Sequence, residues 1–322
     1  MTIFNYFNEY IFYVLALLLN QDKRLKQKGI STLWNRSTKY IRNFLNKTVD
    51  FDKLFLKLIC ILNIDLKTGY FSIDETNYAK PFLSGIRFVS SLFNLSNKGY
   101  FKGFQIVFLC WSNGEITLPV SFRIWHKELG KTKIAIALEL IKYARKISKN
   151  KNLGFRLDSF YTAKILLGYL QQNHIFFAVR LQKSRNVLIG GKLTKLKSIQ
   201  FNRRCINVLL PGVGKVWITR YKKKYYCSNC RPDYQRQLYE WYAERWCIET
   251  VFRFIKSELK MQDCQAFNYN QHVNHIGYCF LAYGLLQAVF PNLNPYEAKK
   301  RIESMFVSKT VTLKPQVFKL CS

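Results

Sequence analysis

The sequence is poor in acidic residues. Of its 322 residues, 19 are Asp or Glu and 51 are Lys or Arg, which gives a formal net charge of +32. A chain with this charge repels itself unless a polyanion neutralises it, and phosphate contacts to nucleic acid do so while releasing counterions. A Lys-rich base composition is the alternative explanation, but it would enrich Glu as well. We therefore predict a nucleic-acid-binding protein.

The N-terminal part also lacks an apolar run long enough to cross a bilayer. The run from Ile11 to Leu19 has nine residues, whereas a membrane helix needs about 20. No basic leader precedes it, so a signal peptide is not expected. We predict a buried helix here and no membrane partner.

Motifs for bound cofactors are scarce. No Gly-rich phosphate loop of the nucleotide-hydrolase type is present, so no nucleotide cofactor is expected. Cys227 and Cys230 could pair with His272 and His275 at a zinc ion, but the gap between the two pairs is far from finger spacing. We therefore do not predict zinc.

The nine cysteines have no regular spacing. This pattern predicts a reduced, cytoplasmic setting without a disulfide framework. Four of the cysteines stand inside apolar runs and are predicted to be small buried hydrophobes; these are Cys60, Cys110, Cys247 and Cys279.

The apolar patterning predicts a mixed sheet with helices packed on it. Residues 1–65 have helical spacing, and strands alternate with helices from Tyr70 onwards. Asn113-Gly114 is a hairpin turn signal, and Pro119 in the returning strand is expected at an edge or a bulge. The predicted strands are 70–74, 104–111, 115–125, 153–158 and 175–181, and the predicted helices are 132–147, 160–172, 233–260 and 273–290.

The piece 28–42 joins a glycine break to a basic amphipathic helix. It fits a helix-turn-helix DNA reader and equally fits an ordinary helical hairpin. The stretch from Ser159 to Pro232 has 15 Lys or Arg and no Asp or Glu. An acid-free stretch of this length indicates a surface that faces phosphate.

Asp74 and Asp158 each end a predicted strand, at the edge where open sheets place active sites. On a helical wheel of the 233–260 helix, one stripe about 80° wide carries polar side chains opposite an apolar stripe. The polar stripe contains Tyr242, Arg245, Glu249, Arg253 and Lys256. An exposed basic face with one ion pair from Glu249 to Arg245 or Arg253 would give the same wheel. Trp246, at the flank of the stripe, is interpreted as a core residue rather than a base-stacking one.

The spacing Tyr242-x2-Arg245-x3-Glu249-x6-Lys256 resembles the Y-R-E-K signature of DDE transposases of the insertion-sequence-four family. The segment around Asp74 resembles the family's first-aspartate segment, although Glu75 stands where the family often has a second aspartate. The segment around Asp158 resembles its second-aspartate segment. The resemblance extends over about residues 25–290.

The resemblance implies an RNase H-like α/β core: a mixed sheet flanked by helices, with a β-rich insertion and an N-terminal helical region. On this basis the chain divides into five parts. These are a helical DNA-binding region (1–65), the first part of the core (66–182), a basic β-rich insertion (183–230), the second part of the core with the glutamate helix (231–291) and a C-terminal tail (292–322).

The resemblance also implies phosphoryl-transfer chemistry at three carboxylates. Asp74 would bridge two Mg²⁺ ions, with Mn²⁺ able to substitute, and Asp158 and Glu249 would be the flanking ligands. The implied DNA contacts are Tyr242, Arg245 and Lys256, with Lys80 and Arg253 as further candidates.

The implied substrate is double-stranded DNA, namely the terminal inverted repeats of a mobile element and a target, bound by a homodimer at the bacterial nucleoid. Two alternatives remain open at this level. One is a decayed or domesticated transposase that binds DNA without cutting it. The other is an RNase H-like nuclease that cleaves without strand transfer.

Overall fold

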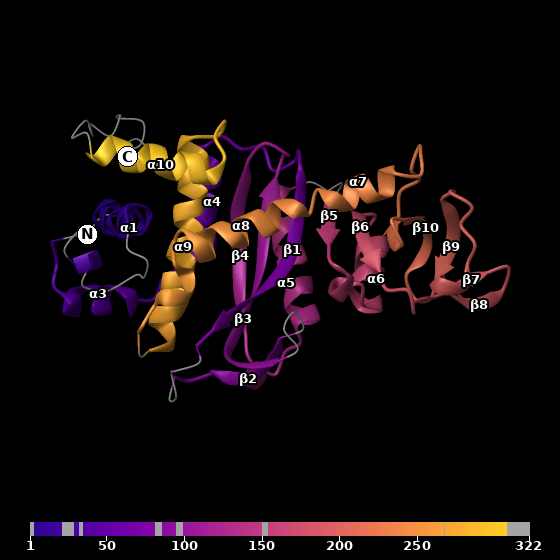
Figure 1. Ribbon diagram of the computed structural model, residues 1–322, viewed down its shortest axis with the longest axis horizontal. Helices are drawn as coiled ribbons and strands as arrows, with labels where there is room; N and C mark the ends of the chain where they lie inside the picture. The colour runs from indigo at the N-terminus through magenta and orange to yellow at the C-terminus, as the bar shows by residue number, and fades with distance from the viewer. Residues whose placement is uncertain are drawn as a thin grey trace.

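The fold is built on one sheet. The structure, a computed structural model, describes residues 3–20, 29–31, 35–80, 86–94, 99–149, 154–266 and 268–307. Eleven strands of these residues form a single mixed sheet in the order β2-β3-β1-β5-β6-β11-β10-β9-β7-β8, with β4 paired to β3. Figure 1 shows an elongated molecule with the N-terminal helices at one end and strands β7 to β10 at the other.

The sheet is mixed in direction. Antiparallel strands β3 and β4 lie beside β1, and β5 and β6 run parallel to β1 on its other side. This arrangement, with helices on the sheet, confirms the predicted mixed α/β class. The strands are β1 (Tyr70–Ala79), β2 (Ser90–Asn94), β3 (Gly99–Ser112), β4 (Thr117–Trp125), β5 (Gly154–Leu157) and β6 (Phe176–Leu181).

The predicted hairpin joins β3 and β4. Asn113 Oδ1 accepts hydrogen bonds from the N–H groups of Glu115 and Ile116, and Gly114 has φ +97°, a conformation that favours glycine. The register shifts after Leu109, where Pro119 pairs with Cys110. Pro119 therefore lies at a β-bulge, as predicted.

The basic insertion extends the same sheet. Strand β11 pairs antiparallel with β6, and the remaining strands follow outward. The sheet is therefore continuous from the core into the insertion. Its outer strands are β7 (Asn186–Ile189), β8 (Lys192–Lys195), β9 (Ile206–Leu210), β10 (Gly214–Tyr221) and β11 (Lys224–Ser228).

Helices cover both faces of the sheet. One face packs against the C-terminal helices and the N-terminal helices, and the other packs against α5 and α6, as the two large clusters of buried side chains show. Both clusters are rich in Phe, Ile and Leu, whose burial stabilises the layers. The helices are α1 (Ile3–Leu18), α3 (Thr38–Leu45), α4 (Phe51–Ile61), α5 (Lys133–Ser148), α6 (Lys164–Gln172), α7 (Gln237–Ala243), α8 (Trp246–Ser257), α9 (Tyr269–Val289) and α10 (Pro295–Val307).

The N-terminal helices share their core with α9. The buried hydroxyl of Tyr13 hydrogen-bonds His275 Nδ1 at 2.9 Å, and the Asn274 side-chain amide donates to the carbonyls of Leu45 and Lys47. Residues 28 and 32–34 of the predicted helix-turn-helix piece 28–42 lie outside the described residues. The rest of it includes the start of α3, capped by Ser37.

Two predictions about local structure are wrong. The single helix over 233–260 is two helices, α7 and α8, separated by a turn at Glu244 and Arg245, and the first begins at Gln237 rather than near Asp233. Cys60 is exposed and Cys247 is half-buried, whereas Cys110 and Cys279 are buried as predicted. The C-terminal part, to which no structure was assigned, contains α10.

None of the described helices combines the length and the apolar composition that crossing a membrane requires.

Candidate active site

Asp74 and Asp158 are neighbours across two parallel strands. Ile73 of β1 and Leu157 of β5 are register partners, and each aspartate is the next residue along its strand. Asp158 directly follows β5, one residue beyond the observed end of the strand that it was predicted to end. Asp74 does not end its strand, because β1 continues to Ala79 along β3. The parallel pairing of β1 with β5 ends at Ile73 and Leu157, the residues just before the two aspartates. Asp74 and Asp158 therefore lie side by side at this end of the pairing.

Asp74 is largely buried and has two donors. Its Oδ1 accepts a hydrogen bond from the N–H of Glu75 at 2.8 Å, and its Oδ2 is bound by Nη1 of Arg245. Burial raises the pKa of Asp74 to about 6, although Arg245 and the Glu75 N–H act in the opposite direction. Its carboxyl group therefore lacks full charge compensation, as expected of a ligand for a stronger cation.

The groups around Asp158 stabilise its ionised carboxylate more than burial destabilises it. Burial alone would raise its pKa, but the N–H of Ser159 and the cations Arg245 and Arg180 outweigh burial and lower the pKa of Asp158. Its Oδ1 accepts a hydrogen bond from the Tyr242 hydroxyl at 3.1 Å and lies 3.4 Å from Nη2 of Arg180. Burial raises the pKa of Tyr242 to about 12, so this hydroxyl stays a donor.

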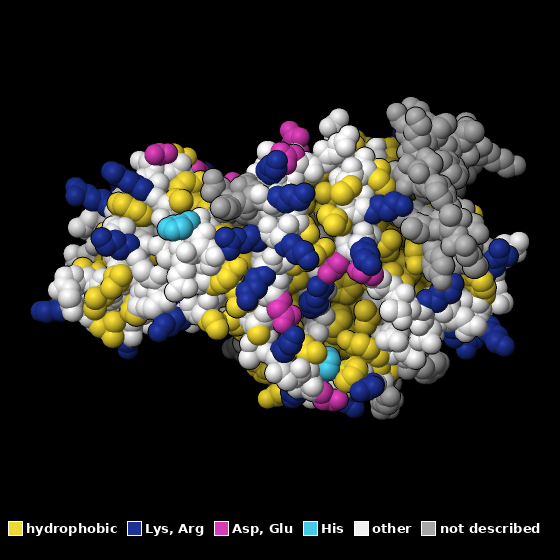
Figure 2. All heavy atoms as spheres, turned by 180° about the vertical axis from the view of Figure 1, so that it is seen from behind, with side chains coloured by type: hydrophobic (Ala, Val, Ile, Leu, Met, Phe, Trp, Pro, Cys, Tyr) yellow, Lys and Arg dark blue, Asp and Glu magenta, His cyan; other side chains and the backbone are white. Residues whose placement is uncertain are grey.

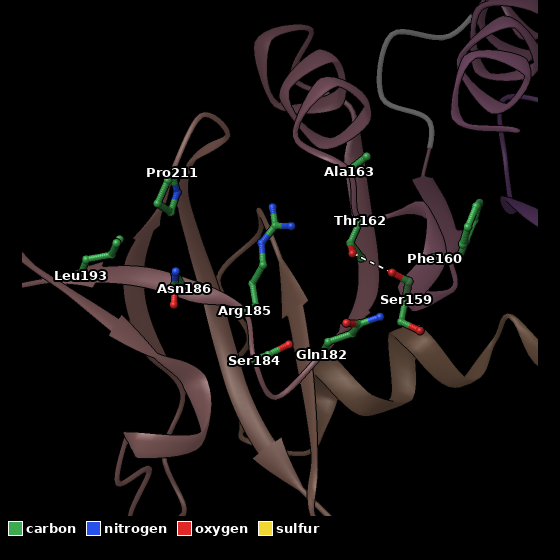
Figure 3. Close-up of a pocket in the computed structure, with 10 residues that line it drawn as sticks. All are labelled: Ser159, Phe160, Thr162, Ala163, Gln182, Ser184, Arg185, Asn186, Leu193 and Pro211. Carbon is green, nitrogen blue, oxygen red and sulfur yellow. Dashed lines mark hydrogen bonds between the residues drawn. The ribbon is translucent and has the colours of Figure 1, made fainter. Parts of the chain in front are cut away.

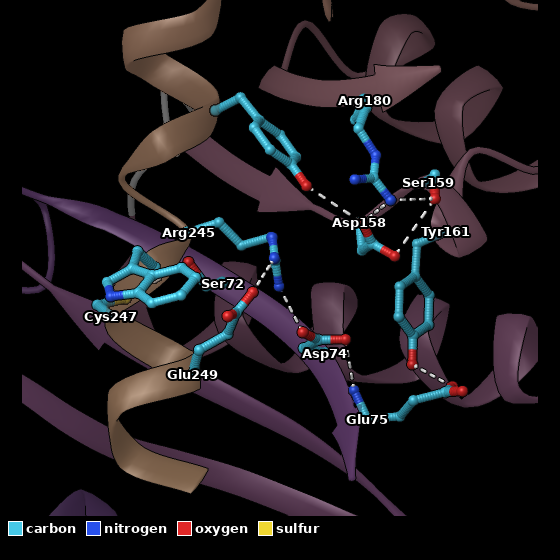
Figure 4. Close-up of polar contacts among 12 residues, drawn as sticks. Ser72, Asp74, Glu75, Asp158, Ser159, Tyr161, Arg180, Arg245, Cys247 and Glu249 are labelled. Atoms are coloured by element: carbon cyan, nitrogen blue, oxygen red, sulfur yellow. Dashed lines mark hydrogen bonds and ion pairs between the residues drawn. The ribbon is translucent and has the colours of Figure 1, made fainter. Parts of the chain in front are cut away.

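Arg245 joins the helix to the sheet. It lies in the turn before α8, and its two terminal amino groups bind Oδ2 of Asp74 and Oε1 of Glu249. Figure 4 shows its guanidinium between these two carboxylates. Burial lowers the pKa of Arg245, but Asp74, Tyr242 and Glu249 raise it by more. The helical wheel allowed an ion pair from Glu249 to Arg245 or to Arg253, and the structure contains the pair with Arg245.

A second group of contacts supports the sheet side of the site. Glu75 accepts a hydrogen bond from the Tyr161 hydroxyl at 3.1 Å and forms an ion pair with Lys133 Nζ at 2.5 Å. Glu75 therefore points to α5 and to the turn after Asp158, away from Arg245 (Figure 4). This arrangement links the residue after Asp74 to the turn after Asp158.

The other predicted DNA contacts lie in different surroundings. Lys256 is half-buried near the end of α8, and burial lowers its pKa. Arg253 is exposed, and its guanidinium lies over the ring of Trp246 at 5.7 Å. Trp246 is 55% exposed, so its interpretation as a core residue is wrong.

Lys80 is separated from the acidic residues of the site. Its side chain is buried, and its Nζ donates to the carbonyls of Gln262 and Cys264, both at 2.5 Å. Its cation thus holds the loop that follows α8, and burial lowers its pKa. This placement does not support the prediction that Lys80 contacts DNA.

The three carboxylates suit a magnesium ion in their chemistry. All their donors are hard oxygens, as Mg²⁺ prefers. In the present arrangement, however, no three acidic, His or Cys side chains among the described residues are close enough to hold one metal ion. The guanidinium of Arg245 takes up the position between Asp74 and Glu249, so a shared ion requires it to release them.

The two histidines considered for zinc are engaged in the core. His272 hydrogen-bonds the Tyr78 hydroxyl through Nδ1 and the Ala266 carbonyl through Nε2, both at 2.9 Å. His275 bonds Tyr13 through Nδ1. Neither ring faces Cys227, which is buried in β11.

Two open hollows begin at Ser159, directly after Asp158. One, of about 590 Å³, is lined by polar and apolar side chains and by Arg185 from the start of the insertion (Figure 3). The other, of about 460 Å³, is bordered by Arg180, Lys183, Lys223 and Lys224. On the face drawn in Figure 2, Lys and Arg side chains are spread over the visible surface, and few acidic ones interrupt them.

Several residues of the site could not be found from the sequence. Arg180 and Lys133 belong to no spaced pattern and reach Asp158 and Glu75 only through the fold. Tyr161 stands in the segment that resembles the second-aspartate segment, but its contact with Glu75 comes from the fold. Arg180 lies in the acid-free stretch that indicated a phosphate-facing surface, and this was the only signal for it.

The family described as "Transposase DDE domain" matches residues 96–285, more than half of the chain. This range contains Asp158 and Glu249 and begins after Asp74. The solved structure of the piggyBac transposase synaptic complex with hairpin DNA is similar, with a TM-score of 0.52, 13% identity, and coverage of 96% of this chain and 74% of that chain. The Mos1 strand transfer complex matches with a TM-score of 0.20, 11% identity, and coverage of 50% of this chain and 55% of that one, which is too weak to indicate a common fold. No curated protein sequence matches the chain significantly.

Proposed function

The chain belongs to the transposase DDE domain family, and from this premise we propose that it is an active DNA transposase. In this proposal it cleaves the ends of an insertion sequence and joins them to target DNA by metal-dependent phosphoryl transfer. The spacing from Tyr242 to Lys256 supports membership of the insertion-sequence-four subgroup.

One observation carries the proposal. Two residues of the spaced signature, Tyr242 and Arg245, bind the two aspartates that lie far upstream in the chain. Arg245 also binds the signature's own Glu249. A surface helix with a chance ion pair would not connect three acidic residues from three separate segments.

The proposed ligands of the metal are Asp74, Asp158 and Glu249. Two bound Mg²⁺ ions would activate the attacking water or 3′-hydroxyl and stabilise the leaving oxygen. The lowered pKa keeps Asp158 ionised at neutral pH, and Tyr242 orients its carboxylate. Arg245 is placed to exchange its two carboxylates for a DNA phosphate, because guanidinium groups bind phosphate with two parallel hydrogen bonds.

We propose that DNA continues from the carboxylates over the insertion. The hollows at Ser159 are bordered by cationic side chains of β6 and of the insertion, and phosphate contacts require such a border. Lys256 and Arg253 would bind phosphates on the side of α8. A DNA-binding role for residues 1–65 and assembly of a homodimer on paired ends belong to the same proposal.

The test uses DNA fragments from the inverted repeats that bracket the coding region. The purified chain is incubated with labelled end DNA, target plasmid and Mg²⁺ or Mn²⁺. We expect nicks at the ends and covalently joined products. Nicks without joined products would favour the nuclease alternative, and binding without either product would favour a decayed transposase.

A further inference from the structure

Glu244 occupies the break between α7 and α8, and both strands that carry the aspartates hold it. The Tyr70 hydroxyl, at the start of β1, donates to the Glu244 carbonyl at 3.2 Å. Nε and Nη2 of Arg156, in β5, contact Glu244 Oε2 at 2.6 and 2.5 Å. The backbone of Glu244 is thus bound to β1, and its side chain is bound to β5.

Arg156 is built into the sheet. Alternation along β5 points Phe155 and Leu157 to the face covered by α5 and α6, so Arg156 points to the opposite face. Arg156 is 6% exposed, and its guanidinium packs over the rings of Tyr70 at 5.0 Å and Phe176 at 4.7 Å. A cation this deep is costly without a partner, and the carboxylate of Glu244 supplies one.

Gly154 provides the space for this side chain. A Cβ atom at position 154 would lie 2.8 Å from Arg156 Nη1 and 2.9 Å from the ring of Phe176. An alanine at this position would therefore displace the guanidinium without removing a charge. The ion pair can thus be disturbed in two independent ways.

We propose that Arg156 and Glu244 are a positioning pair, which fixes the break between α7 and α8 so that Arg245 and Glu249 face the two aspartates. This inference rests on the proposed function. Glu244 immediately precedes Arg245, and Arg156 stands two residues before Asp158, so the pair sets the separation of helix and sheet beside the carboxylates. Displacements of about 1 Å at such a site slow catalysis strongly.

The experiment measures single-turnover cleavage of end DNA at saturating protein, well below the melting temperature of each variant. Glu244→Gln and Gly154→Ala should each lower the cleavage rate at least about tenfold, with the Kd for end DNA unchanged. The matched control is Glu240→Gln, which removes an ion pair with Arg236 and alters a hydrogen bond from the exposed Tyr234 in the same helical segment, and it should cleave like the wild type.

Because the two residues act as a unit, Arg156→Gln combined with Glu244→Gln should lose no more rate than the more damaging single change. Losses that add in full would overturn the pairing. Variants that only melt earlier, and cleave at the wild-type rate while folded, would overturn the positioning role. A wild-type chain that cuts no DNA would overturn the proposed function, and the positioning role with it.

Discussion

Arg245 lies across the gap between α8 and β1 and holds Asp74 through one amino group. Its other amino group holds Glu249, so one cation separates two carboxylates that would otherwise repel each other. All three side chains are largely shielded from solvent, and Arg245 has the lowest exposure. The ion pairs are therefore screened much less than exposed ones.

We predict that Arg245→Ala destabilises the metal-free protein by about 3 kcal/mol near pH 8, because it leaves a buried carboxylate uncompensated. The pKa of Asp74 is about 6 in the intact protein, where Arg245 lowers it. Removal of Arg245 therefore raises the pKa of Asp74 beyond this value. Below that pKa, Asp74 takes up a proton and the charge disappears. The destabilisation should therefore shrink as the pH falls towards 5, and urea unfolding at both pH values measures it.

Magnesium should partly replace the missing cation in this variant. With the guanidinium removed, millimolar Mg²⁺ should raise the melting temperature more in Arg245→Ala than in the wild type. The control is Arg253→Ala, since Arg253 is an exposed cation on the same helix. An equal Mg²⁺ effect in all three proteins would argue against Asp74 and Glu249 as ligands.

Glu249→Gln should separate binding from catalysis. The amide keeps the size of the side chain but is a poor metal ligand, so end-DNA binding should stay nearly intact while cleavage falls by several orders of magnitude. This corresponds to a barrier raised by about 4 kcal/mol or more. Filter binding and single-turnover cleavage give the two quantities, and normal cutting by this variant would exclude Glu249 as a ligand.

Local signals predicted much of the fold. The alternation from Tyr70 and the short strand before Asp158 are correct, because side chains buried on a pleated sheet leave a clear period of two. The Asn113-Gly114 turn follows from the positive φ that glycine tolerates. The convergence of the two aspartates needed only these strands and parallel pairing.

The break between α7 and α8 could not be predicted in the same way. Ala243, Glu244 and Arg245 form helices well, and neither Gly nor Pro marks the turn. The contacts of Glu244 with Tyr70 and Arg156 come from strands remote in sequence. Tertiary contacts of this kind override local propensity and leave no periodic signal.

Lys80 and Trp246 show the same limit for single side chains. The sequence does not reveal whether a lysine ammonium is hydrated at the surface or bound to protein carbonyl groups. The ammonium of Lys80 donates to two carbonyl groups. Trp246 was placed at the flank of a wheel drawn for one straight helix. That position, seven residues before the exposed Arg253, lies on the same face of α8, so it was the residue type and not the position that suggested burial, and the indole is exposed.

Lys256→Ala should weaken DNA binding without a specific effect on chemistry. If Lys256 neutralises one phosphate, its removal flattens the dependence of log K on log salt concentration by about one unit. The matched control is Lys146→Ala, an exposed lysine of α5 on the opposite face of the sheet. Binding measured over a series of salt concentrations checks this prediction, and an unchanged slope would remove Lys256 from the DNA interface.

Two buried histidines should make the fold sensitive to acid. Burial lowers the pKa of His275 to about 3 and that of His272 to about 4, because both rings lie in the core beside α1 and β1. In the unfolded chain these rings gain protons as the pH falls below about 6.5. In the folded state the two rings take up protons only when the pH reaches their lowered pKa values. Between about pH 6.5 and these values, the unfolded state therefore binds more protons than the folded state.

Stability should therefore be full above about pH 6.5 and fall as the pH drops, by about 2 kcal/mol for each histidine between pH 6.5 and 5. Denaturant unfolding at several pH values measures this slope. Asp74, whose pKa is raised to about 6, takes up a proton in the folded state over the same interval and partly offsets this loss. In His275→Gln the loss over that interval should be smaller than in the wild type by the share of one histidine, about 2 kcal/mol, whatever the change in stability at neutral pH. The exposed His174 is the control, and His174→Asn, which tolerates the positive φ at that position, should keep the wild-type slope. An unchanged slope in His275→Gln would mean that this ring can be protonated inside the fold.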